Sequence, residues 1–221
     1  MQPICYIVGA MEPGEIVISP RSEALVIAAD GGLAHLEKRG IAPDWIVGDF
    51  DSLDTAPQGE NVIRHPVEKD DTDTMLAVKT GLARGCRDFV IYGGMGGRTD
   101  HTYANFQTLS YIAAHGGRGW LVAGGMVATV IEGAELSFPS GMEGTISVFC
   151  PGGEAKGVTL KGLYYSLDAA RLTDDFPLGV SNRFTGAEAS VSVAEGRLLV
   201  MWEESAAALV PRLEEEARHD L

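Results

Sequence analysis

The stretch FVIYGGMGGRTDH, residues 89–101, runs from a short apolar segment through four glycines into a polar turn. A helical pattern follows it, because Tyr103, Phe106, Leu109 and Ala113 recur at the spacing that puts side chains on one face of a helix. An apolar strand, a glycine-rich loop and a helix in this order are typical of a parallel α/β sheet. The stretch therefore predicts the fold class of the chain around it.

Residues 1–132 show the same alternation on both sides of this stretch. Further short apolar runs, typical of strands buried on both faces, lie at 4–9, 24–29, 45–47 and 120–123. Helical patterns at 32–39 and 72–84 lie between them. We therefore expect a parallel-sheet α/β domain over residues 1–132.

The pattern changes in the second half of the chain. Polar and apolar residues alternate with a period of two at 145–150 and 189–193, and residues 198–202 are another strand candidate. Because helix-length patterns are missing here, residues 133–203 predict an antiparallel β-sandwich or barrel. The acidic tail, residues 204–221, fits either a short helix or a frayed end.

Composition excludes several classes of protein. The net charge is −14, from 17 Lys and Arg against 31 Asp and Glu, whereas a nucleic-acid binder needs a basic surface. A membrane span needs about 18 consecutive apolar residues, which the chain lacks. The three cysteines are widely spaced and form no C-x-x-C pair, so we expect a reducing, cytoplasmic location.

Seven aspartates lie between Asp44 and Asp73, and six of them fall in clusters at residues 43–52 and 68–73. Like carboxylates repel one another, and Mg²⁺ is a common neutralising ion because it takes oxygen ligands from carboxylates and substrate phosphates. Asp49 and Asp51 are two residues apart, so in an extended segment both carboxylates share a side and can flank one ion. The clusters indicate a metal-assisted phosphate site.

Other polar signals also follow predicted strands. Asp30-Gly31-Gly32 comes after the run at 24–29, and the glycines permit a close approach to a ligand. The glycines of residues 93–97, with Gly94 and Gly96 among them, can turn backbone N–H groups toward phosphate oxygens, and Arg98 can add a bidentate clamp. In open α/β sheets ligands bind at the carboxyl ends of the strands, so we expect these groups to meet there.

Familiar alternatives are missing from the sequence. There is no G-x-x-x-x-G-K-[ST] phosphate loop, no G-x-G-x-x-G after the first strand, where residues 9–12 read GAME, and no G-x-S-x-G nucleophile elbow. Taken singly, Asp73 and Asp100 also fit helix N-caps. The remaining interpretation of the site is a nucleotide phosphate held by aspartates through Mg²⁺.

Four ordered blocks then make the chain resemble the thiamine pyrophosphokinase (thiamine diphosphokinase) family. They are ADGG at 29–32, PDWIVGDFDS at 43–52, KDDTDT at 69–74 and GGMGGRTDH at 93–101. Weaker matches follow at 160–167, 179–184 and 191–193. The resemblance covers nearly the whole chain apart from the acidic tail.

The resemblance implies an activity. Enzymes of this family transfer a diphosphoryl group from ATP to the hydroxyl of thiamine, which attacks the β-phosphorus and releases AMP. It also implies an α/β nucleotide domain followed by a β-sandwich, dependence on Mg²⁺, and a homodimer with active sites at the subunit interface.

The resemblance assigns roles to individual residues. The metal-side carboxylates are expected to be Asp49, Asp51 and Asp70. The groups expected to carry the chemistry are Asp51, Asp73, Arg98 and Asp100, and either Asp73 or Asp100 would accept the hydroxyl proton. The phosphate side is expected to include Asp30, Gly31, Gly94, Gly96 and Arg98, and the thiamine rings to contact Tyr165, Ser181 and Asn182. Asp44, Asp54 and Asp71 are expected to be surface or turn residues.

Two departures from the family pattern leave the acceptor open. Tyr165 stands where many relatives have Trp, and Arg183 replaces an acidic residue close to where a cationic thiazolium is expected. The alternatives are a diphosphokinase for another alcohol, such as a hydroxymethylpterin, and a catalytically silent nucleotide-binding module.

Overall fold

The computed structural model describes residues 3–19, 24–50, 57–64 and 70–219. The chain forms two compact units, Met1–Gly125 together with Ser205–Leu221, and Met126–Glu204. The expected boundary at residue 132 is the last residue of strand β7 (Met126–Glu132), which the structure includes in the second unit. Strand β7 belongs there because it pairs along its whole length with β14 (Arg197–Glu203).

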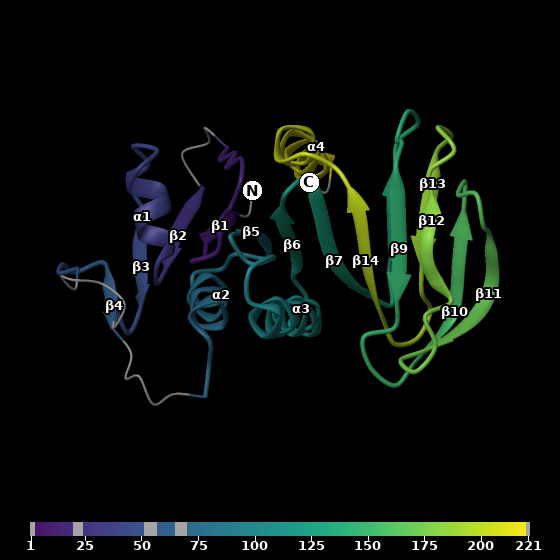
Figure 1. Cartoon of the computed structure of the whole chain (residues 1–221), viewed down its shortest axis with the longest axis horizontal. Helices are drawn as coiled ribbons and strands as arrows, with labels where there is room; N and C mark the ends of the chain where they lie inside the picture. The colour runs from purple at the N-terminus through teal and green to yellow at the C-terminus, as the bar shows by residue number, and fades with distance from the viewer. Residues whose placement is uncertain (1–2, 20–23, 51–56, 65–69, 220–221) are drawn as a thin grey trace. The chain divides into compact units, whose positions relative to one another are not determined.

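The first unit is built on parallel strands (Figure 1). Among the described residues they pair in the order β6-β5-β1-β2-β3-β4. Their bounds are β1 Ile4–Val8, β2 Leu25–Ala29, β3 Trp45–Gly48, β4 Val62–Arg64, β5 Asp88–Tyr92 and β6 Arg118–Ala123. Both β1 and β5 are buried along their whole length, as the continuous apolar runs in the sequence predict.

The strand order contains one reversal. After β1 the chain builds outward through β2, β3 and β4, then returns to place β5 on the other side of β1. The carboxyl ends of β1 and β5 therefore border the switch point of the sheet, where open α/β proteins form their ligand crevice.

Helices connect these strands and cover the sheet. Their bounds are α1 Gly32–Glu37, α2 Asp73–Ala83, α3 Thr99–Ala114 and α4 Ala206–His219. Helices α2 and α3 lie side by side (Figure 1), and α2 approaches the sheet closely because a Cβ at Gly81 would lie 2.7 Å from the ring of Phe89. The acidic tail is thus the helix α4, which belongs to the first unit.

The second unit consists of two antiparallel layers. One has the order β12-β9-β14-β7 and the other the order β11-β10-β13-β8. The remaining bounds are β8 Glu135–Phe138, β9 Thr145–Phe149, β10 Glu154–Lys161, β11 Leu167–Thr173, β12 Gly179–Arg183 and β13 Ala189–Ser192.

Aromatic side chains fill the space between these layers. The ring of Phe138 on β8 packs edge to face against the rings of Trp202 on β14 and of Phe184. The ring centroids are 5.2 Å apart for Trp202 and 5.0 Å apart for Phe184. This buried contact makes the unit a sandwich, which confirms the expected fold class. Within the described part of the chain, no helix is long and apolar enough to cross a membrane.

Candidate active site at the carboxyl edge of the parallel sheet

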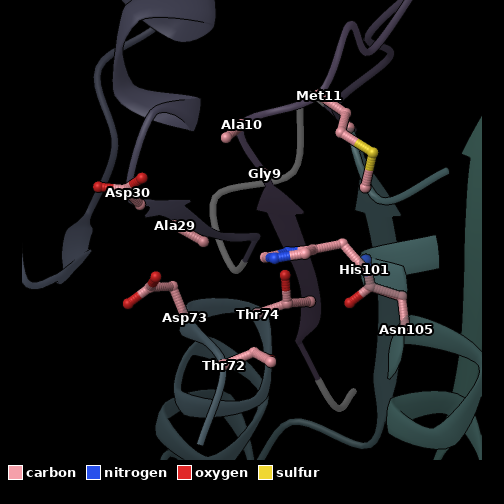
Figure 2. Close-up of a pocket in the computed structure, with 11 residues that line it drawn as sticks. Gly9, Ala10, Met11, Ala29, Asp30, Thr72, Asp73, Thr74, His101 and Asn105 are labelled. Atoms are coloured by element: carbon pink, nitrogen blue, oxygen red, sulfur yellow. The ribbon is translucent and has the colours of Figure 1, made fainter. Parts of the chain in front are cut away.

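A cavity of about 130 Å³ lies at the carboxyl ends of β1, β2 and β5, at the switch point of the sheet. Loops that follow the strands form part of its wall, and the start of α2 and the first two turns of α3 form the rest (Figure 2). The lining residues are Gly9, Ala10, Met11, Ala29, Asp30, Thr72, Asp73, Thr74, Gly93, His101 and Asn105. The cavity is therefore where the sheet topology predicts a ligand.

The polar side chains lie on different sides of this cavity. Figure 2 shows the carboxylates of Asp30 and Asp73 on one side, with His101 and Asn105 on the other. The cavity thus presents carboxylate acceptors to one part of a ligand and an imidazole and an amide to another.

Two helices begin at the cavity. Thr72 is the N-cap of α2, and its hydroxyl accepts a hydrogen bond of 3.2 Å from the backbone N–H of Met75. Arg98 holds the N-cap position of α3. Neither Asp73 nor Asp100 is therefore an N-cap. The partial positive charge of two helix N-termini offsets the carboxylates and favours an anion such as a phosphate.

Asp30 has an unusual backbone conformation. Its φ of +48° lies in the left-handed region, which costs free energy for most residues but which aspartate tolerates. Its backbone N–H donates to the carbonyl oxygen of Val47 at 2.8 Å, which fixes the turn after β2. The next residue, Gly31, allows this turn to approach the loop after β1, since an added Cβ would lie 3.0 Å from the Cβ of Ala10.

Gly93 brings two loops into contact across the cavity wall. It has a φ of +64°, and an added Cβ would lie 2.6 Å from the carbonyl oxygens of both Gly9 and Met11. The backbone N–H of Met11 donates to the carbonyl oxygen of Gly93 at 3.2 Å. Only glycine fits this approach without displacing the loop after β1.

The loop after β1 is also fixed from further along the chain. The hydroxyl of Tyr92 donates to the carbonyl oxygen of Val17 at 2.7 Å, and burial raises the pKa of this phenol above its usual range. The ring nitrogen Nε2 of His35 lies 3.1 Å from the carbonyl oxygen of Ala10. These contacts hold the wall of the cavity in place.

The glycine loop itself is fastened to α3. The buried amide of Asn105 donates to the carbonyl oxygen of Gly94 at 2.7 Å, and an added Cβ on Gly94 would lie 2.6 Å from Leu121. The backbone N–H of Gly96 donates to the hydroxyl of Thr102 at 3.2 Å. Gly94 and Gly96 thus shape the loop, and this N–H of Gly96 is already engaged within the protein.

Arg98 and Asp100 form an ion pair at the start of α3. Two guanidinium nitrogens donate to the two carboxylate oxygens at 2.6 and 3.2 Å, while both side chains remain about two-thirds exposed, at 69% and 65%. Hydrogen bonding from Arg98 is the main cause that lowers the pKa of Asp100 to about 2. Asp100 is therefore fully ionised at neutral pH, and Arg98 has to release it in order to clamp a phosphate.

The expected metal-side residues are only partly described. Asp49 follows the end of β3 and is half-buried, Asp70 is exposed ahead of α2, and Asp51 lies outside the described residues. In the ranges that the structure covers, no three or more His, Cys, Asp or Glu side chains form a group that could hold a metal ion by themselves.

The chemistry of the donors at this edge nevertheless fits Mg²⁺. Asp30, Asp49 and Asp73 follow strand ends or begin a helix here and offer carboxylate oxygens, the ligands that Mg²⁺ prefers. Mg²⁺ commonly takes only one or two carboxylates and completes its shell with water and substrate phosphates. A preformed cage is therefore not required.

Two of the clustered aspartates have structural partners. A carboxylate oxygen of Asp44 accepts the backbone N–H of Val26 at 2.7 Å, at the start of β2. Asp71 accepts two hydrogen bonds from the ammonium of Lys79, at 2.6 and 2.8 Å, which raise the pKa of Lys79. Both act within the fold, as expected for turn residues, whereas Asp54 lies outside the described residues.

In the second unit the structure brings together Tyr165, Ser181 and Asn182. Tyr165 is exposed, and its backbone N–H donates to the side-chain oxygen of Asn182 at 2.9 Å. Ser181 is exposed with a φ of +57°, and its backbone N–H donates to the hydroxyl of Ser147 at 3.0 Å.

Several residues that line the cavity were assigned no role from the sequence. They are Gly9, Ala10, Met11 and Asn105, together with Thr72, Thr74 and His101, which stand in the family blocks without an assigned role. The sequence did carry a signal for residues 9–11, because they directly follow β1 and ligands bind at the carboxyl ends of parallel strands. Thr72 and Thr74 follow no predicted strand. The start of helix α2 positions them at the cavity.

Comparison with known proteins adds to this geometry. The model of the thiamin pyrophosphokinase catalytic domain matches residues 20–118, and that of the thiamin pyrophosphokinase vitamin B1 binding domain matches residues 134–198. The chain belongs to the thiamin pyrophosphokinase family. Membership places it among the diphosphotransferase enzymes.

Individual members of the thiamin pyrophosphokinase family show the same relation. The thiamine pyrophosphokinase of Bacillus subtilis strain 168 is 27% identical over 185 residues, which cover 80% of this chain and 86% of that protein. A crystal structure of thiamine pyrophosphokinase from Bacillus subtilis has a TM-score of 0.79 at 24% identity, covering 92% of this chain and 99% of that one. The yeast thiamin pyrophosphokinase shares the fold at 15% identity, with a TM-score of 0.68 over 91% of this chain and 86% of that one.

Proposed function

We propose that the chain transfers the diphosphoryl group of ATP to the hydroxyl of thiamine and so forms thiamine diphosphate and AMP. The observation that carries this proposal is the cavity at the switch point, where Asp30 and Asp73 meet the N-termini of α2 and α3. A phosphate chain suits this combination, because helix N-termini attract its charge while carboxylates can hold its counter-cation.

In the proposed reaction the hydroxyl oxygen of thiamine forms a bond to the β-phosphorus of ATP. The bond from that phosphorus to the oxygen bridging the α-phosphate breaks, and this oxygen leaves with AMP. The hydroxyl proton goes to a carboxylate, and we assign this role to Asp73. Asp73 lines the cavity, whereas Asp100 is held by Arg98, and a pKa lowered to about 2 makes Asp100 a poor proton acceptor.

Arg98 has a second role in this proposal. Its guanidinium is exposed and forms an ion pair with Asp100 at the start of α3. Exchanging that carboxylate for phosphate oxygens would place a fixed positive charge where negative charge shifts during transfer. Gly31, Gly94 and Gly96 contribute by allowing the loops to approach the phosphates.

We propose that Asp49, Asp51 and Asp70 hold Mg²⁺. When bound, the ion would neutralise phosphate oxygens and so supply charge stabilisation that the side chains cannot provide alone. The support is the donor chemistry at this edge of the sheet and the family resemblance.

We propose that the thiamine rings bind where Tyr165, Ser181 and Asn182 lie together in the second unit, whose family counterpart is named for vitamin B1 binding. Tyr165 and Ser181 are exposed and would contact the rings, whereas Asn182 is buried and holds the main chain of Tyr165. An exposed tyrosine ring suits a cationic thiazolium, since aromatic faces attract cations. Arg183 does not argue against this substrate, because its guanidinium lies over the ring of Tyr164 at 4.0 Å.

We also propose a cytoplasmic homodimer with active sites at the subunit interface. In support, Phe176, Leu178 and Val180 expose apolar side chains at and before the strand β12, and such patches are typical of contact surfaces. The free cysteines Cys5, Cys86 and Cys150 fit a reducing compartment. Light scattering at several protein concentrations measures the assembly directly.

The test of the activity uses the whole protein with ATP and Mg²⁺, and either thiamine or a hydroxymethylpterin as acceptor. AMP and a diphosphorylated product are measured by chromatography. The proposal predicts AMP and thiamine diphosphate in equal amounts with thiamine only. Product from the pterin alone would support the other diphosphokinase, and nucleotide binding without AMP from either acceptor would support the silent module.

A further inference from the structure

The side chain of Asn182 is unusual among its neighbours because it is buried. Only 3% of it is exposed, whereas Ser181 and Arg183 on either side are exposed. Its amide oxygen accepts the backbone N–H groups of Tyr165 and Arg183, each at 2.9 Å, and its amide nitrogen donates to the carbonyl oxygen of Tyr165 at 2.7 Å. Asn182 thus binds the main chain of Tyr165 through both its donor and its acceptor.

Arg183 acts on the same tyrosine through another residue. Its guanidinium lies over the ring of Tyr164 at 4.0 Å from the centroid. The ring of Tyr164 in turn meets that of Tyr165 edge to face, at 4.8 Å and 88°. The backbone N–H of Tyr164 donates to the carbonyl oxygen of Arg183 at 3.0 Å. Tyr164 and Arg183 are therefore joined by a main-chain hydrogen bond as well as by the contact between their side chains.

We propose that Asn182 and Arg183 are positioning residues that hold the ring of Tyr165 ready for a planar cationic ring. Asn182 fixes the main chain of Tyr165, and Arg183 fixes its ring through Tyr164. This rests on the proposed function, in which Tyr165 receives thiamine. Neither residue touches the substrate in this arrangement.

The arrangement also determines the sign of the effect of Arg183. A guanidinium aimed at the substrate would repel a cationic ring, and its removal would strengthen binding. A guanidinium stacked on Tyr164 instead limits the motion of both tyrosines, so that less freedom is lost when the substrate binds. Removing its charge should therefore weaken thiamine binding.

The first experiment compares the steady-state kinetics of Arg183→Gln with the wild type. The KM for thiamine should rise about two- to fivefold, which corresponds to the ~0.5–1 kcal/mol of an exposed cation–π contact. The kcat and the KM for ATP should stay unchanged, and Arg183→Lys should restore most of the loss. A lower KM for thiamine in Arg183→Gln would overturn the proposal.

Arg171→Gln is the matched control. Arg171 is an exposed arginine of the same unit that pairs with Glu154 at 2.6 Å and lies over neither tyrosine. Its substitution should leave all three kinetic constants unchanged. A rise in the thiamine KM equal to that of Arg183→Gln would attribute the effect to net charge and also overturn the proposal.

Asn182→Asp tests the main-chain contact. It keeps the two accepting bonds but replaces the amide donor to Tyr165 with an oxygen, which leaves the half-buried carbonyl of Tyr165 without this partner and facing another oxygen. The thiamine KM should rise about tenfold or more while the KM for ATP is retained. An unchanged thiamine KM in a folded Asn182→Asp variant would contradict the role of Asn182.

A ligand-free measurement separates this inference from the proposed function. With 3-fluorotyrosine at position 165, the ¹⁹F resonance should shift and narrow in Arg183→Gln, because the ring becomes more mobile, and stay unchanged in Arg171→Gln. An unchanged resonance in Arg183→Gln overturns the positioning role whatever the substrate is. Failure of the wild type to convert thiamine overturns the proposed function instead, and leaves the resonance to decide the role of Arg183.

Discussion

The side-chain amide of Asn105 donates a hydrogen bond of 2.7 Å to the carbonyl oxygen of Gly94 and so ties helix α3 to the glycine loop. Asn105 is 4% exposed and also lines the cavity. One buried amide thus joins the helix, the loop and the candidate site, and this contact gives the first prediction.

Asn105→Ala should lower the free energy of unfolding by about 1–3 kcal/mol, because the buried carbonyl of Gly94 loses its partner. Urea denaturation measures this difference. Gln107→Ala, an exposed position on the same helix, is the control and should change stability by less than about 0.5 kcal/mol. Equal stability of the two variants would show that this hydrogen bond does not hold the loop.

Gly93→Ala should destabilise the protein more than Gly85→Ala. Both glycines have positive φ, at +64° and +86°, so alanine costs about 1–2 kcal/mol of backbone strain at either position. Only Gly93 adds a clash, since nothing lies within 4 Å of a Cβ at Gly85. We expect a further loss of about 1–3 kcal/mol at Gly93, measured by thermal or urea unfolding. Equal losses of stability in the two variants would mean that the loop after β1 moves to accommodate the added Cβ at no measurable cost.

Asp73→Asn should lower kcat about 10²- to 10⁴-fold if Asp73 accepts the hydroxyl proton. The fold should persist, because Thr72 caps α2. Asp71→Asn is the control, as its carboxylate pairs with Lys79 at the surface, and turnover should stay within about twofold with a stability change of at most about 1 kcal/mol. Release of AMP at the wild-type rate by Asp73→Asn would transfer the role to Asp100.

Arg98→Gln should raise the pKa of Asp100 from about 2 toward the ordinary range of an aspartate. Titration of the Asp100 carboxyl carbon by ¹³C NMR measures this shift. Arg84→Gln, at an arginine that stacks on Trp45, should leave the titration unchanged. A pKa that remains near 2 in Arg98→Gln would mean that another group holds the carboxylate.

The same shift has a consequence for stability against pH. The pKa of Asp100 is lower in the folded protein than in the unfolded chain, so the ion pair favours the folded state above about pH 4. This contribution is lost as the pH falls toward 2. Unfolding curves of the wild type and Arg98→Gln should therefore converge with falling pH between about 4 and 2.

The sequence predicts the strands of the first unit well where burial leaves a continuous apolar run. Residues 4–9, 89–92 and 120–123 correspond to β1, β5 and β6. The run is short where the strand is peripheral, and the three residues of β4 (Val62–Arg64) went unrecognised. In the second unit the sequence predicts β9, β13 and β14, whereas β7, β8, β10, β11 and β12 were not predicted. For β10 and β11 the reason is that register shifts in their pairing interrupt the alternation of polar and apolar residues.

The candidate site is predictable only in part. Asp30 and Asp73 carry a signal in the sequence, because a charged residue directly after a strand or at the start of a helix indicates a ligand site at the carboxyl edge of the sheet. The burial of Asn182 carries none, since a polar residue between two exposed ones is indistinguishable from a surface residue until its hydrogen bonds are placed. Tertiary contacts thus decide whether such a residue faces a ligand or supports one that does.

The reversal of strand order at β1 has a further consequence for how the protein responds to a ligand. The cavity is lined by residues 9–11, 29–30, 72–74, 93, 101 and 105, which only the assembled sheet brings together. A ligand bound there restrains segments from β1, β2, β5, α2 and α3 at once, so its binding free energy adds to the stability of the whole unit rather than of one loop. Amide hydrogen exchange in all five segments should then slow together as the ligand concentration rises. Ligand binding would thus raise the free energy of unfolding of the whole unit.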